Sequence, residues 1–207
     1  MRYLFLIVSL LACTNLFAQD NRREPGVWKD IPLTPAVGRV VDVEFDPNDG
    51  DRMYAAPDAN GIWYTEDQGK HWECITDNIP EVDARISNSE IMVDPDNFNK
   101  IYYVGEFGHY YKTEDRGQNW TRVKDKNGDP IFLTDFKRSL VARDQAGDLL
   151  MVCTTIGRDH GKNSTWVKGL HVSHDEGITW KHFPNPSREE EYLEIAIHPT
   201  NTNIIYA

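Results

Sequence analysis

The sequence predicts an all-β fold built from repeated four-stranded units, and three observations support this prediction. An eight-residue pattern, Ser/Thr-x-Asp-x-Gly-x-x-Trp, occurs at 65–72, 113–120 and 173–180. A second marker, an Asp or His followed eight residues later by Tyr or Val, recurs at positions 46, 94, 144 and 198, in steps of 48, 50 and 54. No strong helical periodicity interrupts these units. A regular period of about 50 residues is typical of β-propeller blades, so we expect a β-propeller.

Each unit is expected to hold four short strands in chain order. In the first unit, the apolar inner strand spans Val40 to Phe45 and the second strand spans Arg52 to Ala56. The third strand ends in the eight-residue pattern, and the outer strand begins near its Trp. In this pattern the Asp can accept backbone N–H groups across a tight turn, the Gly supplies a positive φ, and the Trp anchors the next strand. We call these three segments box turns.

The repeats also predict how the chain is divided. A propeller domain is expected at 27–207, with blades at about 39–77, 88–125 and 138–184 and a shortened blade from 192. Gly26 to Ile31 resembles the outer strands but has no box turn in front of it, and the sequence stops at Ala207 within a second strand. Closed propellers need about four to eight blades. We therefore expect an N-terminal fragment of about three and a half blades, with the remaining blades in a missing C-terminal part. The alternative is a complete short chain that builds its ring from several copies.

The N-terminus has the features of a secretory signal. Arg2 supplies a positive charge, Tyr3 to Ala12 is apolar, and Ala18 is a small residue before a cut. Residues 1–18 are expected to be removed, which leaves 19–26 as a flexible leader and places the protein outside the cell or on its surface. The apolar run is shorter than the ~20 residues of a membrane-spanning helix, so no membrane span is expected. The alternative is a lipoprotein anchored at Cys13.

Charge and cysteine content narrow the possible partners. The chain carries 22 Lys and Arg against 33 Asp and Glu, a net charge of −11, and signal removal makes it −12. Nucleic acid is an unsuitable ligand because a polyanion requires clustered Lys and Arg, which are absent apart from Arg22-Arg23 in the leader. After signal cleavage Cys74 and Cys153 remain, on predicted strands of different blades. They should be too far apart for a disulfide, so buried thiols are expected.

The box turns resemble the Asp-box, or BNR repeat, of β-propellers such as sialidases, sortilin and xyloglucanase-type glycoside hydrolases. From Trp28 to Ala207 the chain is most similar to secreted bacterial proteins related to the sortilin N-terminal propeller. Short segments typical of their blades carry this resemblance, among them Gly38-Arg39-Val40, Ile62-Trp63-Tyr64-Thr65 and Asn99-Lys100-Ile101-Tyr102-Tyr103. Sortilin binds peptides inside its propeller, so this resemblance implies a binding or adhesion role. Sialidases carry a Phe/Tyr-Arg-Ile-Pro motif near the N-terminus, and this sequence has none.

The strand order predicts which loops lie on each of the two faces of the propeller. The loops between first and second strands and the box turns lie on one face, which we call the turn face. The loops between second and third strands and the connections between blades lie on the other, which we call the loop face. Functional residues are expected on the loop face. The spacing from marker to box turn is 21 residues in the first two units but 31 in the third, so we predict an inserted loop from Gly157 to Gly169 there. Arg and Trp are favoured contact residues in interfaces, so an inserted loop that carries both indicates ligand recognition. The alternative is a polar surface loop that binds no ligand. The ligand-binding candidates are Glu106, His109, Arg158, Asp159, His160 and Trp166.

The recurrence of the box turns at the same place in every blade favours structural roles over catalysis or calcium binding. Their Asp residues recur in every blade on the turn face, and their Trp residues are expected to pack between blades. These structural residues are Asp67, Gly69, Trp72, Asp115, Gly117, Trp120, Asp175, Gly177 and Trp180. His171 and His174 flank a strand end without a zinc-type spacing, so no metal and no cofactor are expected.

The second-ranked prediction is a glycoside hydrolase. The segment Tyr54 to Trp63 is similar to the first blade of xyloglucanase-type enzymes, and the resemblance implies that Asp58 is the catalytic base. Pro57 and Asn60 replace the Thr and the first Gly of that family's Thr-Asp-x-Gly-Gly setting. An inverting enzyme also needs a carboxylic acid about 6.5 to 9.5 Å away. In the xyloglucanase family a second propeller supplies this acid. Glu106 and Asp159 are alternative candidates for the acid in this chain because of their positions on the loop face. The first-ranked prediction remains a non-catalytic module that binds protein or glycan on the loop face.

Overall fold

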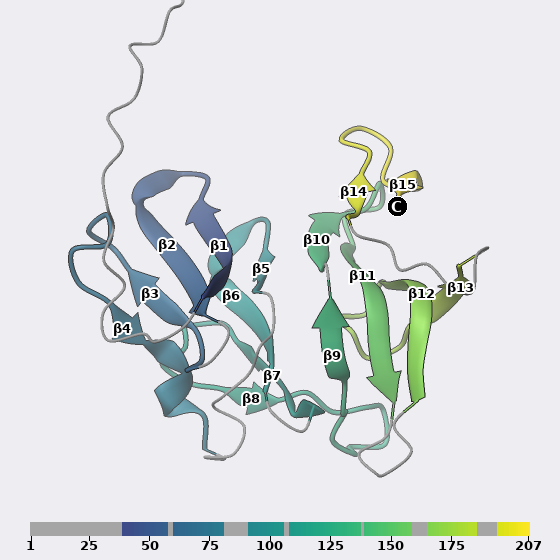
Figure 1. Ribbon diagram of the computed structural model, residues 1–207, viewed down its shortest axis with the longest axis horizontal. Helices are drawn as coiled ribbons and strands as arrows, with labels where there is room; N and C mark the ends of the chain where they lie inside the picture. Colours follow the sequence, from purple (N-terminus) through teal and green to yellow (C-terminus); the bar gives the residue numbers. More distant parts are fainter. Residues whose placement is uncertain are drawn as a thin grey trace, which may run out of the picture. The chain divides into compact units, whose positions relative to one another are not determined.

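The computed structural model describes residues 39–57, 60–80, 91–105, 108–137, 139–158, 165–185 and 194–207; for 134–137, 155–158 and 165–168 it describes the backbone alone. The described elements belong to one unit, Ile31–Ala207. Labelled as in Figure 1, they are β1 (Val40–Asp46), β2 (Asp49–Pro57), β3 (Trp63–Thr65), β4 (Glu73–Cys74), the 3₁₀ helix η1 (Ile75–Asn78), β5 (Met92–Asp94), β6 (Asn97–Val104), β7 (Tyr110–Thr113), β8 (Thr121–Arg122), β9 (Thr134–Lys137), β10 (Leu140–Arg143), β11 (Leu149–Arg158), β12 (Thr165–Ser173), β13 (Lys181–Pro184), β14 (Ala196–Ile197) and β15 (Ile205–Tyr206).

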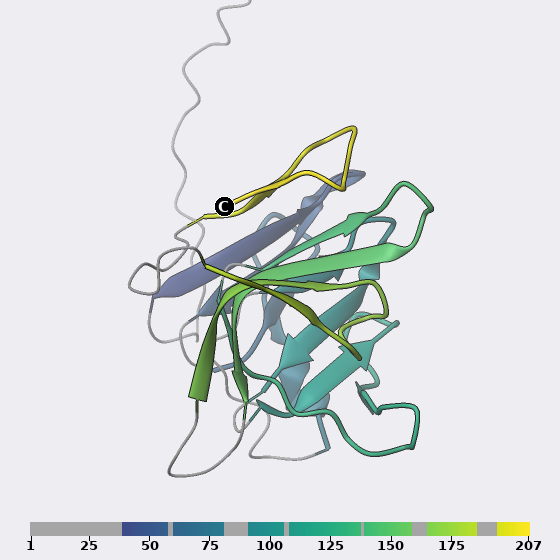
Figure 2. The same ribbon diagram turned by 90° about the vertical axis from the view of Figure 1, so that its right-hand side faces the viewer.

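Three antiparallel sheets each contain four strands in chain order. Blade one is β1–β4, blade two is β5–β8, and blade three is β10–β13 with β9 added beside β11. The strands β14 and β15 form a separate hairpin, drawn in yellow beside β10 of blade three in Figure 1 and turned by 90° in Figure 2. The prediction of an all-β fold made of four-stranded blades is confirmed.

The register of the blades is the same at the box turns. In each blade, the first residue of the box turn ends the third strand and lies opposite a buried apolar residue of the second strand. These pairs are Met53 with Thr65, Ile101 with Thr113, and Met151 with Ser173. Positions in different blades can therefore be equated by counting from these pairs.

Blade three departs from the first two in its first hairpin. Tyr54 and Tyr102 lie opposite Glu44 and Met92, but Val152 lies opposite Leu140, so the β10–β11 hairpin is two residues longer. Ala142 thus occupies the position of the buried Asp46 and Asp94, and the expected equivalence of Asp144 with these residues is wrong. Asp144 instead lies in the turn, where its Oδ1 accepts the N–H groups of Ala146 (2.8 Å) and Asp148 (2.9 Å).

Both ends of the inserted loop predicted in blade three are strand extensions. Gly157 and Arg158 continue β11, and Trp166 lies in β12, because Gly157 pairs with Trp166 and Arg158 with Thr165. The strand β9 pairs with this extension, with Lys137 opposite Thr155. We call this three-stranded segment, made of β9, 155–158 and 165–168, the ribbon. The expectation of a loop was wrong for 157–158 and 165–169, which lie in two strands that pair with each other, whereas 159–164 lie outside the described residues.

Successive strand residues point to opposite faces of a sheet, and the core follows this alternation. In blade two, Ile101 and Tyr103 pack in a cluster with blade one, whereas Tyr102 and Val104 pack in a cluster with blade three. A third cluster joins blade three to the β14–β15 hairpin. The blades are thus held by apolar layers between neighbouring sheets.

The cysteines of the described residues are thiols, as expected. Cys153 is fully buried between blades two and three, and Cys74 is partly exposed on β4. Burial raises the pKa of the Cys74 thiol, which lowers its reactivity.

Candidate functional site

The two faces of the blades can be located from hydrogen bonds. Box turns contact the beginnings of the second strands: the N–H of Gln68 donates to the carbonyl of Asp51 in β2 (3.0 Å), and the N–H of Arg116 donates to that of Asn99 in β6 (2.9 Å). These contacts define the turn face. The loop face lies at the opposite ends of the strands, where β2, β6 and β11 end.

Each box turn is closed by the same set of hydrogen bonds. In blade two, the hydroxyl of Thr113 donates to Asp115 (2.8 Å) and accepts the N–H of Gly117 (2.9 Å), while Asp115 also accepts the N–H of Asn119 (2.8 Å). The other two blades repeat these bonds with Thr65, Asp67, Gly69 and His71 and with Ser173, Asp175, Gly177 and Thr179.

The carboxylates of the box turns are occupied by these bonds. The backbone and the ring of His71 hold the pKa of Asp67 well below its ordinary value, because hydrogen bonds to a carboxylate favour its charged form. A carboxylate that is ionised and bonded within its own turn is a poor proton donor for catalysis. The three Asp side chains also lie on the face opposite the strand ends that carry the candidate loops.

The Trp residues of the box turns differ in their contacts. Trp120 is buried against blade one, and its Nε1–H donates to the carbonyl of Ile75 (2.9 Å). Trp180 packs against the cluster between blades two and three, and its Nε1–H donates to Gly177 of its own turn (2.9 Å). Trp72 is half-buried.

Blade two presents an aromatic and cationic group at the loop face. His109 forms a β-bridge with Phe132, and their rings meet edge to face at 5.4 Å. The Arg122 guanidinium lies over the Phe132 ring at 4.7 Å, and Phe132 is 50% exposed. The N–H of Leu133 donates to the carbonyl of Gly108 (2.8 Å), which ties the connection between blades two and three to this loop. Of this group, sequence reasoning selected His109 alone.

Phe132 and Arg122 were missed, although a signal for Phe132 exists. The connection at 124–130 is polar, and Ile131-Phe132-Leu133 is a short apolar run that follows it. An apolar run after a polar turn indicates a segment that returns to the sheet. No sequence pattern selects Arg122, because it joins the group only through its contact with the Phe132 ring, ten residues further along the chain.

The remaining candidates lie on or beside the ribbon. Arg158 and Trp166 are near neighbours across β11 and β12, because Arg158 pairs with Thr165 and Trp166 with Gly157. The structure therefore brings these two positions to the same end of blade three. Asp58, Glu106, Asp159 and His160 lie outside the described residues.

No group of three or more His, Cys, Asp or Glu that could hold a metal ion exists within the described ranges. In the same part of the chain, no helix has the length and apolar character needed to cross a membrane.

Repeated four-stranded blades with their box turns on one face define a β-propeller module. Comparison with known families specifies its kind: residues 25–165, more than half of the chain, match the family Sortilin-Vps10, described as "Sortilin, neurotensin receptor 3". The chain belongs to this family. No curated protein matches the sequence.

Solved structures with a similar fold include two enzymes. The GH74 xyloglucanase from Xanthomonas campestris has a TM-score of 0.51 and 18% identity over 79% of this chain and 25% of the enzyme. The GH74 enzyme from Niastella koreensis has a TM-score of 0.51 and 17% identity over 79% of this chain and 24% of the enzyme. A more distant likeness, to YCF48 from Cyanidioschyzon merolae, has a TM-score of 0.45 and 18% identity over 76% of this chain and 40% of that one. The chain thus spans about a quarter of the two enzymes, and these likenesses show the fold alone.

Proposed function

We propose that this chain is a non-catalytic propeller module that binds a protein or glycan ligand on its loop face. The observation that carries the proposal is the ribbon, which extends blade three with backbone pairing on both sides of β11. Paired strands hold a recognition surface in one conformation, so less conformational entropy is lost on binding than with an open loop. The family name includes a receptor, which agrees with a binding role.

The residue types at this face suit such ligands. Trp166 and Arg158 are positioned on neighbouring strands of the ribbon, and Trp and Arg dominate the energetics of protein recognition. Phe132, Arg122 and His109 add an exposed aromatic ring with a cation stacked on it. Aromatic faces bind side chains and sugar rings, and a guanidinium binds carboxylates in bidentate fashion. Glu106, Asp159 and His160 are proposed as further contacts.

A binding screen tests this proposal. The purified chain is applied to a glycan array and to a phage-displayed peptide library, and every hit is measured again by calorimetry. The double variant Arg158→Ala with Trp166→Ala should weaken a genuine hit at least tenfold, whereas Lys70→Ala, an exposed cation on the turn face, should leave it unchanged. Equal binding by both variants, or retention of no ligand from either library, would contradict the proposal.

A glycoside hydrolase is the second proposed function, and the likeness to two GH74 enzymes favours it. In this reading Asp58 is the base, and Glu106 or Asp159 is the acid. The test is release of reducing ends from xyloglucan by the natural full-length protein. Cleavage that Asp58→Asn abolishes, without a change in melting temperature, would replace the binding proposal with the hydrolase.

We also propose that the protein is secreted or displayed on the cell surface, with a signal peptide at 1–18, a leader at 19–26, and further blades supplied by additional chain. Intact mass spectrometry of the exported protein tests the first point. A mature N-terminus at Gln19 supports simple secretion, whereas an acylated Cys13 indicates the alternative lipoprotein.

A further inference from the structure

The fourth residue of each box turn has a left-handed backbone, and in blades two and three its side chain reaches the preceding blade. Gln68, Arg116 and Glu176 have φ values of 62°, 61° and 58°. We call this residue the latch, because in blades two and three it bonds to the preceding blade. The residues of the preceding blade that receive it are its seat.

The first seat, on blade one, receives the latch Arg116. The Arg116 guanidinium donates to the hydroxyl of Tyr64 (3.0 Å) and to Glu66 (2.8 Å), and it lies over the Tyr64 ring at 4.5 Å. Gly117, the next residue, packs so closely that an added Cβ would lie 2.6 Å from the Cβ of Ile75. Seat one is therefore filled by a cationic latch on an aromatic and anionic surface.

The second seat, on blade two, receives an anionic latch. Lys100 and Lys112 donate to the carboxylate of Glu176 at 2.6 and 2.8 Å. The hydroxyl of Tyr110 donates to the carbonyl of Glu176 (2.7 Å), and a Cβ added at Gly177 would lie 2.8 Å from that hydroxyl. The two seats thus differ at one third-strand position, Tyr64 under the cationic latch and Lys112 under the anionic one, whereas both keep a cation on the second strand, Arg52 or Lys100.

The shared register locates a third seat on blade three. Four positions recur: the second-strand residue before the one that pairs with the box turn, the residues one and three places before the box turn, and the residue three places after its Trp. In seat one these are Arg52, Ile62, Tyr64 and Ile75; in seat two Lys100, Tyr110, Lys112 and Val123; in seat three Leu150, Leu170, Val172 and Phe183.

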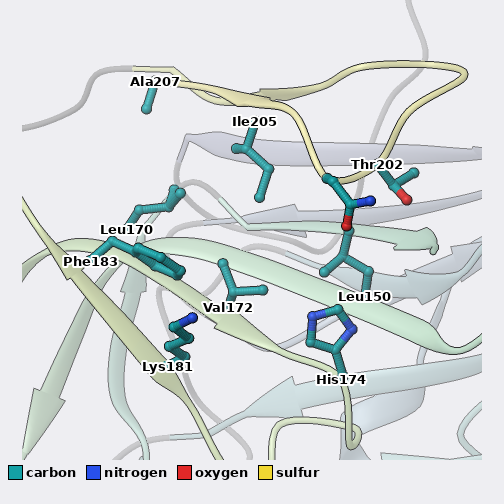
Figure 3. A pocket seen from close by; sticks show the side chains of 10 residues that line it. Leu150, Leu170, Val172, His174, Lys181, Phe183, Thr202, Ile205 and Ala207 are labelled. Atoms are coloured by element: carbon teal, nitrogen blue, oxygen red, sulfur yellow. The ribbon is translucent and has the colours of Figure 1, made fainter. Parts of the chain in front are cut away.

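Seat three is apolar and open. Its four residues line a cavity of about 520 Å³ beside the β14–β15 hairpin, and Figure 3 shows them grouped below Ile205. Phe183 is 42% exposed, although its counterparts in the first two seats are buried. Leu150, Val172 and Ile205 belong to one apolar cluster, so the cavity continues the existing interface between blade three and the hairpin.

We propose that seat three binds the box turn of a further blade and that the latch of this turn is apolar. The occupant follows from the two filled seats, in which the equivalent space holds a box turn with its Gly against the seat. The character of the latch follows from the floor of seat three, because Leu150, Leu170 and Val172 offer no partner for a charge. A charged group buried without a partner is strongly disfavoured.

The polar groups at the edge of seat three modify this preference. Lys181 lines the cavity with its Nζ over the Phe183 ring at 4.9 Å, and His174 lies 3.1 Å from Asp144. A cationic latch would meet Lys181 as a like charge, whereas an anionic latch could approach it. The expected order of latches is therefore Leu, then Glu, then Lys.

A graft onto the full chain tests the proposal. Tyr206 occupies the position of Tyr102, since they pair with Ala196 and Met92 in the same register, so a copy of residues 104–124 placed after Ala207 continues the blade. In this copy the position of Arg116 is made Leu, Glu or Lys. We expect the folding equilibrium constant, from urea titration, to be roughly tenfold larger with Leu than with Lys.

A reciprocal change supplies the control. Val172→Lys recreates Lys112 of seat two, and it should make Glu the best of the three latches. Independently, the ¹³C-methyl signals of Leu150 and Val172 should shift between the ungrafted chain and the Leu graft. Equal stability of the three grafts, or unmoved methyl signals, overturns the proposal. So does a concentration-dependent dimer of the ungrafted chain in sedimentation that Val172→Lys dissociates, because a second copy would then occupy the seat.

Discussion

Replacement of Glu176 by Gln measures what a charged latch contributes. Partial burial raises the pKa of Glu176, but the hydrogen bonds of Lys100 and Lys112 outweigh it and lower the pKa from 4.5 to about 2. A pKa lowered this far corresponds to at most about 3 kcal/mol. The side chain is 31% exposed, and solvent screening reduces this to about 1–2 kcal/mol. The carbonyl of Glu176 keeps its bond from Tyr110, so the turn itself should persist.

The assay is urea unfolding of the wild type and of Glu176→Gln at pH 7 and near pH 2. At pH 7 the variant should unfold at a urea concentration lower by ~0.5–1 M. A carboxylate with a depressed pKa stabilises the fold above its unfolded pKa, and this contribution is lost as the pH falls through the folded pKa. The difference should therefore shrink between pH 4.5 and 2.

Glu114→Gln is the matched control. Glu114 is 67% exposed and its carboxylate lies 3.8 Å from Nζ of Lys112, so its loss should cost less than ~0.5 kcal/mol. The latch argument fails if Glu114→Gln destabilises as much as Glu176→Gln, or if the effect of Glu176→Gln is undiminished near pH 2.

Three further predictions concern the blade interfaces. Gly117→Ala should lower the free energy of unfolding by at least ~3 kcal/mol, because a Cβ there would lie 2.6 Å from a carbon of blade one. Gly128→Ala, also at positive φ but in open space, should lower it by only ~1–2 kcal/mol. Similar losses in the two variants would exclude packing as the cause. Trp120→Phe should cost ~1–2 kcal/mol more than Trp72→Phe, because the Trp120 N–H bond crosses to blade one while the Trp72 N–H has no partner among the described residues. Burial and the neighbouring carboxylate of Asp42 raise the pKa of Glu44 to about 7. The free energy of unfolding should therefore fall as the pH rises from 4.5 to 7. Glu44→Gln should be ~1–3 kcal/mol more stable than the wild type above pH 7 and equal to it at pH 4, as measured by urea unfolding.

The fold could be predicted because its determinants are local in sequence. The bonds of a box turn, such as those among Thr65, Asp67 and Gly69, lie within eight residues, and they recur with a regular period. Alternating burial in strands such as β6 follows from side-chain direction alone. The β10–β11 hairpin was misjudged, because the eight-residue offset from Asp144 to Val152 matches the other units although the pairing differs by two residues.

Much of the candidate site could not be predicted, since it depends on contacts distant in sequence. The ribbon requires β9 to pair with β11, some twenty residues along the chain, and composition alone does not separate a long hairpin from a loop. The group of His109, Arg122 and Phe132 arises when a connection between blades returns to a loop of the preceding sheet. The latch residues lie at a variable position of the box turn, and their partners belong to another blade.

The opposite charges of the first two latches have a consequence for how this array of repeats can arise and fold. Blades of such similar backbone could dock in the wrong order, but a blade three placed against blade one would lose one of the two cations that hold Glu176, because Tyr64 stands at the position of Lys112. Each latch thus favours the neighbour it has. A gene duplication that copies one blade would yield a unit that its new neighbour binds less well, until substitution rewrites either the latch or the seat.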